Sequence, residues 1–220
     1  MVTRSRSAGL CALLLALTLI VRVSSRAIAA DLVPQGKLAT LELDPAKTAI
    51  TYSLDGWPHN TQGTFKLKHG VIRIDPATGK IDGIITVDAA SGSSGHSIRD
   101  ERMKSSILEV SRFAEIRFAP RQVVSHGSLL KEFPVKVRGL MLLHGVQHDL
   151  TINSVASLEG NNVMIHSNFV IPYVEWGLED PSVLMFKVSK DVAVDVTTVA
   201  RLSWNVPASA PDPINSANPP

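Results

Sequence analysis

The sequence contains almost no cysteine. Its 220 residues include a single one, Cys11, which lies inside an apolar run near the N-terminus. The rest of the chain therefore cannot form a disulfide, a thiolate metal site or a cysteine nucleophile. Stability must come from packing alone, and this favours a closed sheet with a large interior.

The sequence also lacks a strong excess of charge. It has 22 lysine and arginine residues against 20 acidic ones, a formal net charge of +2, and its basic residues are scattered. A nucleic-acid-binding surface needs clustered basic residues, so this balance argues against one. The length suits one good-sized domain, because two full domains would be cramped.

The apolar run near the N-terminus is short for a membrane span. It covers residues 9–21, whereas a spanning helix needs roughly 20 apolar residues. Arg4 and Arg6 precede the run, and Ala27 and Ala29 offer small residues at the two positions that a signal peptidase reads. We therefore predict a cleaved signal peptide at residues 1–30 and a periplasmic or secreted protein, with an uncleaved anchor as the alternative.

Motifs of several enzyme classes are missing from the sequence. It has no Gly-x-Ser-x-Gly nucleophile motif, no phosphate-binding loop and no dinucleotide fingerprint. His144 and His148 have the spacing of zinc ligands on a helix, but they straddle Gly145 in a predicted hairpin. We predict no catalytic residue, no metal and no cofactor. A hydrolase built around His96 and Asp100 is the weaker alternative.

Most of the chain alternates between apolar and polar residues with a period of two, which is typical of half-buried strands. The predicted strands cover residues 38–44, 47–54, 64–74, 80–89, 115–124, 133–143, 147–158, 162–174 and 183–202. Short connections join most of them, and closure would remove their exposed edges. We predict an all-β fold, an eight-stranded antiparallel barrel over residues 31–202, followed by a disordered tail at 203–220.

One stretch interrupts the strands. After a Gly/Ser-rich run, residues 97–110 carry apolar side chains at a spacing that fits one face of a short helix. We expect this helix to close one end of the barrel through Ile98, Met103, Ile107 and Leu108. Arg99 and Asp100 are its predicted positioning pair.

The strand faces that we assign to the interior are strongly apolar. They carry Phe65, Ile85, Phe118, Met141, Leu143, Ile165, Phe169, Leu184 and Phe186. Alternation alone cannot distinguish a solid core from a cavity. Met103 and Trp176 are further candidates, in the helix and in a loop. Lys190 shares the parity of the interior residues on the last strand, so it is expected to point inward and to meet a carboxylate or a ligand head group.

Two leucines are expected on the outer face. Leu140 and Leu142 alternate with the inward Met141 and Leu143. An apolar outer surface implies a covering element or a contact between two copies of the chain. A homodimer is therefore one predicted partner state.

Short motifs also follow one another in a recognisable order. They are residues 43–46 with Ile50 and Tyr52, 63–67, 75–80, 97–100, Met103-Lys104, 107–109, 115–118, and Gly139 with 143–146. In this order they resemble the YceI-like family of exported, lipocalin-like barrels. The chain departs from the family pattern at Phe113-Ala114, where a proline is missing, and at His59, which is the candidate substitute for a displaced histidine.

The resemblance implies an eight-stranded barrel whose interior holds a polyisoprenoid or similar acyl lipid, without catalysis. Under this interpretation the lipid-binding residues are the inward set above together with Met103 and Trp176, and Lys190 is a candidate head-group contact. The alternative function is a filled-barrel structural or stress-response module that acts as a dimer.

Overall fold

The computed structural model of the protein describes residues 37–126, 132–182 and 187–205. The predicted signal peptide at 1–30 and residues 206–220 of the predicted tail lie outside the described residues. Leu184 and Phe186 lie outside them as well. Within the described ranges, no helix is both long enough and apolar enough to cross a membrane.

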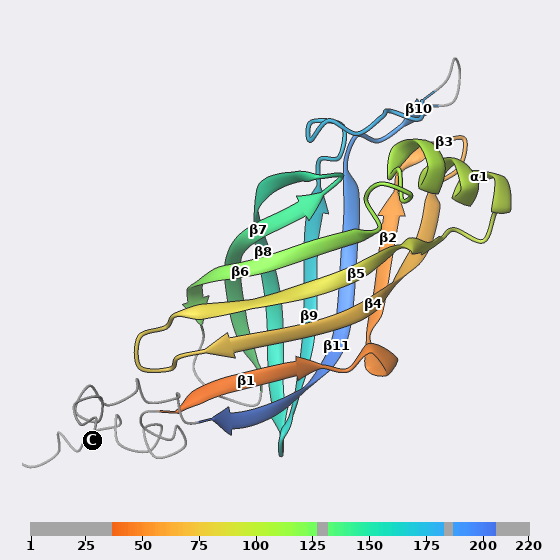
Figure 1. The fold of residues 1–220 in the computed structure, drawn as a ribbon. Coiled ribbons are helices and arrows are strands. Elements are labelled where there is room, and N and C mark those ends of the chain that lie inside the picture. Colours follow the sequence, from red (N-terminus) through yellow and green to blue (C-terminus); the bar gives the residue numbers. More distant parts are fainter. Residues whose placement is uncertain (1–36, 127–131, 183–186, 206–220) are drawn as a thin grey trace, which may run out of the picture. The chain divides into compact units, whose positions relative to one another are not determined.

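Strands make up most of the described chain (Figure 1). They are β1 Leu38–Leu43, β2 Ala49–Leu54, β3 Gly56–Trp57, β4 Thr61–Ile74, β5 Ile81–Ser93, β6 Glu115–His126, β7 Phe133–Leu143, β8 Val146–Glu159, β9 Asn162–Ile171, β10 Lys187–Val188 and β11 Val192–Asn205. The alternation of apolar and polar residues explains these assignments, since each long strand has one face towards the interior and one towards water.

The long strands close into an antiparallel barrel. From β4 to β9, each strand pairs with the next one in the chain, and β11 then pairs with β9 on one side and with β2 on the other. The ring therefore has no free edge, which removes the row of unpaired backbone groups that would otherwise invite aggregation.

One position of the ring is shared by two strands. Both β1 and β2 pair with β4 and with β11, at successive levels of the barrel. Between them lies the 3-10 turn Pro45–Lys47, where the Asp44 side chain accepts a hydrogen bond from the Ala46 amide at 2.9 Å. Nine strands thus occupy eight positions, and the predicted eight-stranded barrel is confirmed.

The two ends of the barrel differ in their connections. At one end, which we call the helix end, lie the β2–β4, β5–β6 and β7–β8 connections and the described parts of the β9–β11 connection. The long connections there are residues 94–114 and, after β9, residues 172–182 and 187–191. At the other, the turn end, lie the short turns at 75–80 and 160–161, together with the start of β1 and the end of β11. Figure 1 shows α1 and β3 at the helix end.

The predicted helix is confirmed, but it changes type part-way. The α-helix α1 spans Ser97–Arg102, and a π-helical turn, η3, continues it over Met103–Ile107. The Leu108 amide donates to the Met103 carbonyl at 2.8 Å, which is the i to i+5 bond of a π turn. The turn also marks a change in burial, because Ile98 in α1 is exposed whereas Leu108 after η3 is buried.

The last predicted strand is two strands in the structure. Residues 187–188 form β10, which pairs with β3 in a small separate sheet, and β11 begins only at Val192. Between them the Ser189 amide donates to the Asp55 carbonyl at 2.7 Å, outside the barrel ladder. At its other end β11 continues to Asn205, three residues beyond the predicted barrel limit at 202.

Buried side chains gather in two clusters. The first lies towards the helix end and contains Leu108, Phe118, Met141, Leu143, Leu150, Tyr173 and Leu178. The second lies along the β2, β4 and β11 wall and contains Leu43, Ile50, Tyr52, Leu67, Val194 and Ala200. Half-buried residues such as Phe65, Ile85 and Phe169 pack against both clusters, so they lie between the two.

Candidate functional site

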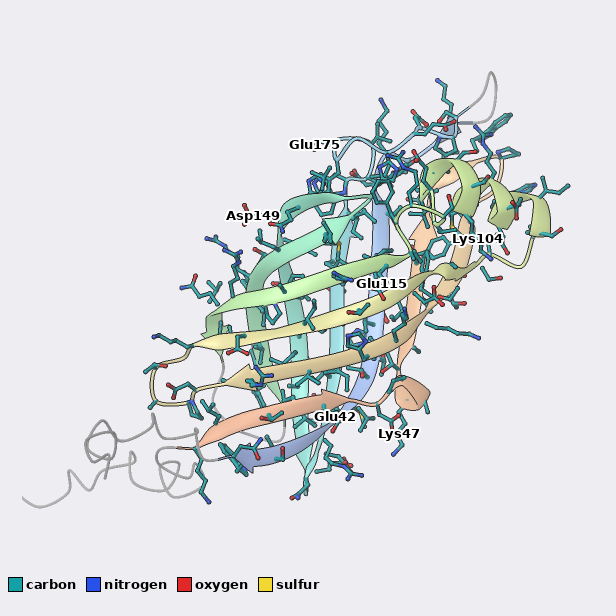
Figure 2. The ribbon with its side chains drawn as sticks, viewed as in Figure 1. Glu42, Lys47, Lys104, Glu115, Asp149 and Glu175 are labelled. Carbon is teal, nitrogen blue, oxygen red and sulfur yellow. The ribbon has the colours of Figure 1, made fainter. Side chains whose placement is uncertain are left out.

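The barrel encloses a cavity of about 430 Å³. This volume falls within the roughly 300–1,000 Å³ that is usual for small-molecule sites. Inward-facing side chains from every ring strand line it, together with residues of the helix end. In Figure 2 the labelled charged residues Asp149 and Glu175 lie on the outside of the ribbon.

The partial burial of the inward residues also indicates that the barrel interior is not filled. Phe65, Ile85 and Ile165 point into the barrel, yet they are only half-buried. In a filled barrel such side chains would be fully enclosed, because protein interiors pack at the density of organic crystals. Their remaining accessible surface faces the cavity, and the barrel is therefore hollow.

Eight of the predicted lipid-binding residues line the cavity. They are Phe65, Ile85, Met103, Phe118, Met141, Leu143, Ile165 and Phe169. Seven lie on the inward faces of strands, as their alternation predicts, and Met103 reaches in from η3. Of the remaining candidates, Leu184 and Phe186 fall outside the described residues.

Trp176 does not line the cavity. It lies in the 172–191 segment and stacks on the His148 ring, with ring centroids 4.2 Å apart and an interplanar angle of 3°. It is half-buried against the first cluster. The stacked Trp176 ring thus connects the segment after β9 to the start of β8. It covers the barrel end from outside the cavity.

The expectation that Lys190 points inward is wrong. Lys190 lies in the bend between β10 and β11, and it is exposed. The prediction extended the alternation of β11 back through residues 189–191, but the strand is interrupted there. Exposure leaves the ammonium in water, and Lys190 helps to hold the pKa of the Asp180 carboxyl below its ordinary value, after the larger effect of the Ser182 hydrogen bonds.

Residues of the two long connections close the helix end. Met103, Ile107 and Leu108 line the cavity from one connection, and Tyr173, Leu178 and Pro181 line it from the other. Ile98 was also expected to contribute, but it is 87% exposed. The α-helical turns lie on the outside, and only the residues from η3 onwards reach the barrel interior.

The lack of a side chain at Gly92 leaves room for Met103 inside the barrel. A Cβ atom added to Gly92 would lie 2.7 Å from the Met103 methyl carbon and 2.6 Å from the Phe65 ring. Both distances are too short for any side chain. Gly92 therefore provides the space in which Met103 and Phe65 meet below the helix end.

Polar contacts fasten the helical segment at its two ends. At the start, Asp100 accepts hydrogen bonds from the Ser94 amide and hydroxyl, at 2.7 and 2.6 Å, and from the Ser93 hydroxyl at 3.0 Å. These bonds, the one from the Ser94 hydroxyl first, lower the pKa of the Asp100 carboxyl. Asp100, one of the predicted positioning pair, thus holds the start of the helix through the two serines.

At the other end of the segment, Glu109 joins the helix to the β7–β8 turn. Its carboxylate pairs with Arg112 and lies 3.1 Å from the His144 ring. Hydrogen bonding to Arg112 is the main cause of a lowered Glu109 pKa, with a further contribution from His144. Glu109 and His144 both have positive φ angles, 44° and 51°. Two strained residues in contact indicate that the surrounding structure fixes this junction firmly.

Among the described residues, the cavity lining has no charged group and few polar ones. Its residues include no lysine, arginine, histidine or carboxylate, and its polar side chains are Thr48, Tyr52, Ser154, Ser167, Tyr173 and Thr198. Burial raises the pKa of Tyr52, and it raises that of Tyr173 to about 12, so both phenols are neutral. The cavity therefore suits an uncharged, apolar occupant.

The histidine hypotheses find little support in the geometry. His96 is exposed, and Asp100 meets it only through the backbone, where the Asp100 amide donates to the His96 carbonyl at 2.9 Å. His144 and His148 are held by different neighbours, since His144 contacts Glu109 and Phe113 while His148 stacks on Trp176. Within the described ranges, no group of three or more metal-ligating side chains is close enough to hold a metal ion.

Comparison with known proteins agrees with this geometry. The sequence matches the YceI-like domain over residues 41–200, which covers almost all of the barrel. The chain belongs to the YceI-like family. The resemblance noted in its sequence motifs is thereby confirmed.

Solved structures share the fold at low sequence identity. Burkholderia cenocepacia BcnA is 16% identical, with a TM-score of 0.58 over 71% of this chain and 98% of that one. A polyisoprenoid binding domain from Saccharophagus degradans implicated in plant cell wall breakdown is 17% identical, with a TM-score of 0.57 over 74% and 98%. No curated protein matches the sequence significantly.

Ser154 and Ser167 are among the lining residues that the sequence analysis did not identify. They are opposite one another on β8 and β9, and their hydroxyl oxygens are 2.7 Å apart. The length of a turn in the sequence could have predicted their position. The two-residue turn at Gly160-Asn161 pairs Glu159 with Asn162, and this register places Ser154 opposite Ser167 on the inward face.

Proposed function

We propose that this protein binds a long apolar lipid, a polyisoprenoid or a similar chain, inside the barrel and catalyses no reaction on it. The observation that carries the proposal is the hollow, uncharged cavity of about 430 Å³. Membership of the YceI-like family supports it, as does the polyisoprenoid-binding description of the similar Saccharophagus degradans domain.

Burial of the chain supplies the binding free energy. Each methylene transferred from water to an apolar site contributes about 0.8 kcal/mol. Several such groups outweigh the cost of immobilising the ligand. The uncharged lining restricts what can enter, because a charged head group would lose its hydration without gaining a partner. The head group of a charged lipid therefore stays outside the cavity.

We further propose that the protein is exported and works in the periplasm or outside the cell. The short N-terminal apolar run after Arg4 and Arg6, with Ala27 and Ala29 beyond it, supports this location. The absence of cysteine after Cys11 is compatible with it, since the folded chain depends on no redox state. Fractionation of cells that express the full chain, followed by mass spectrometry of its mature N-terminus, tests the location.

Extraction of the purified protein tests the function directly. Organic extraction followed by mass spectrometry is expected to release a prenyl or acyl species in near-stoichiometric amount. Repeatedly empty protein would count against the proposal.

A chain-length series provides the second test. Affinity for unbranched alcohols is expected to rise about fourfold per added methylene, the equivalent of 0.8 kcal/mol, and then to level off when the cavity is full. Affinity that does not depend on chain length would contradict binding inside the barrel.

The alternative function, a filled-barrel module that acts as a dimer, is weakened by the cavity. Its dimer part stays a proposal, based on the apolar pair Leu140 and Leu142 on the outer face of β7. Both are already half-buried within a single chain. Light scattering of wild type and Leu142→Asp tests it, because a dimer through this surface would dissociate in the variant.

A further inference from the structure

The hydroxyl groups that line the cavity differ in whether each of their protons has an acceptor within the protein. This difference bears on what kind of chain the cavity accepts, so the inference below rests on the proposed function and extends it. Two hydroxyl pairs face the cavity, Thr48 with Thr198 and Ser154 with Ser167. Each hydroxyl has one proton to donate and can accept further hydrogen bonds.

Both protons of the threonine pair are committed. The Thr48 hydroxyl donates to the Asp44 carbonyl at 2.7 Å, and the two threonine oxygens are 2.6 Å apart. Since the Thr48 proton goes to Asp44, Thr198 must donate to Thr48. Neither threonine has a proton left for a ligand.

The serine pair has one proton left over. Ser154 and Ser167 are 2.7 Å apart, so one hydroxyl donates to the other. The second proton finds no acceptor in the part of the chain that the structure describes. A donor without an acceptor in an apolar site is costly, and native structures normally supply a partner.

The neighbours of the pair are apolar. Along one level of the barrel, Val135 lies opposite Ser154, and Ser167 lies opposite Val196. The same row continues to Ile50 and then Phe65. The pair is thus a single polar point on an apolar wall, and any acceptor for its free proton has to come from inside the cavity.

We propose that Ser154 and Ser167 form an internal anchor that binds one neutral acceptor oxygen on an otherwise apolar chain. Carbonyl, ether and hydroxyl oxygens have this chemistry. A phosphate or carboxylate does not fit, because the lining residues that the structure describes include no cationic side chain to pair with it. The favoured ligand class is therefore a long chain with an uncharged oxygen at one depth along its length.

A set of straight-chain ketones of one length, which differ only in the position of the carbonyl, tests the anchor. Their affinities, and that of the alkane of equal length, are measured by displacement of the uncharged fluorescent probe N-phenylnaphthylamine from the full chain. In wild type, ketones of one or two adjacent positions are expected to bind roughly threefold to tenfold tighter than the alkane, the effect of one hydrogen bond.

Two variants identify the source of this preference. In the double variant Ser154→Ala/Ser167→Ala the ketone preference is expected to disappear, while alkane binding is retained or increased. The control is Thr198→Val, which alters the threonine pair, whose protons are both already donated. In this variant the preference for the ketones is expected to persist. Retained alkane binding also shows that the double variant is folded.

The outcomes separate this proposal from the proposed function. Equal binding of alkane and all ketones in wild type would overturn the anchor and leave lipid binding intact. So would a preference that survives in the double-alanine variant. If neither alkane nor ketone binds the wild-type protein, lipid binding itself fails, and the anchor fails with it.

Discussion

The packed helix end and the hollow middle of the barrel are built from the same kind of residue. Leu150 and Ile152 lie two positions apart on the inward face of β8. Leu150 is 7% exposed and belongs to the first cluster, whereas Ile152 is half-buried and lines the cavity. Both side chains point to the same face of β8, so the difference in their burial arises from what lies opposite each of them.

The covering segments decide which part is filled. At the helix end, Leu108, Tyr173 and Leu178 come from the two long connections and occupy the space that the strands leave. Further down, Thr48, between β1 and β2, is the one lining residue of the described chain that comes from a connection. An eight-stranded barrel is wide enough to keep a slender space open there. The barrel is thus stabilised mainly at its covered end and on the β2, β4 and β11 wall.

The largest expected effect comes from shortening Leu150 and Ile152, since it compares the packing of the helix end directly with that of the hollow middle. Leu150→Ala is expected to lower the free energy of unfolding by about 2–5 kcal/mol, because a cavity opens in packed surroundings. Ile152→Ala should cost less, about 1–2 kcal/mol, since part of its surface already faces empty space. Urea unfolding measures both. Equal losses would show that the middle is as well packed as the end.

Filling the middle should reduce binding without a loss of stability. Val137→Phe places an aromatic ring in the cavity, where Val137 is a lining residue. The affinity for a long chain is expected to fall about tenfold, since the ring displaces roughly two methylene groups at 0.8 kcal/mol each. The free energy of unfolding should be unchanged or higher.

The matched control for this change is Val155→Phe. Val155 lies on the outward face of the neighbouring strand β8 and is 43% exposed. Its substitution adds the same ring on the other side of the barrel wall, so chain affinity should equal that of wild type. A similar loss in both variants would place the ligand outside the barrel.

The attachment of the covered end can be weakened at Glu109. Glu109→Gln removes the ion pair with Arg112 and the contact with His144. Because the Glu109 pKa lies below its ordinary 4.5, its contribution to stability is present above about pH 4.5 and is lost as the pH falls through the lowered value. The variant should be less stable than wild type at neutral pH, and the difference should shrink in acid.

The corresponding control is Glu101→Gln, in the exposed part of α1. Unfolding of all three proteins is followed in urea between neutral and acidic pH, together with the rate of probe uptake. Faster uptake in Glu109→Gln alone would show that the covered end is the entry route. Identical uptake would favour entry elsewhere.

The smallest effect is expected on the outer face of the barrel. Glu115 lies between Lys68 at 2.7 Å and Arg117 at 2.6 Å, and these partners, Lys68 first, lower its pKa to about 2. The contribution of this group is therefore present above about pH 4.5 and is lost only as the pH falls towards 2.

Glu115→Gln is expected to flatten the acid side of the stability profile slightly and to leave ligand binding unchanged, because exposed ion pairs contribute little. The control is Glu42→Gln, an exposed residue of β1. Urea midpoints across the acidic range measure both. A change in chain affinity in Glu115→Gln would contradict the separation of outer and inner faces.

Much of this fold could be predicted from the sequence. Period-two alternation fixes which side chains share a face, so the strands and seven lining residues, among them Phe65 and Ile165, follow from it. The helical spacing likewise located the segment that covers one end. These are local properties, and each strand shows them within its own residues.

What could not be predicted depends on the space between elements. Alternation is identical for Leu150 and Ile152, and only the positions of the long connections separate a filled from an open interior. Lys190 was misplaced because the Ser189 amide leaves the ladder for Asp55, a partner far away in sequence. Ile98 was misplaced because helical spacing does not show which turns reach the barrel.

The position of β11 has a consequence for how the chain folds. As the last strand of the described chain, it pairs with β9, β2 and β1, the three strands that would otherwise have open edges. Until β11 is synthesised, the preceding strands can form only an open, curved sheet with exposed edges and an exposed apolar face. Closure joins residues as distant as Leu38 and Asn205, so we expect it to be a slow, late step of folding, before which the open sheet is exposed to self-association.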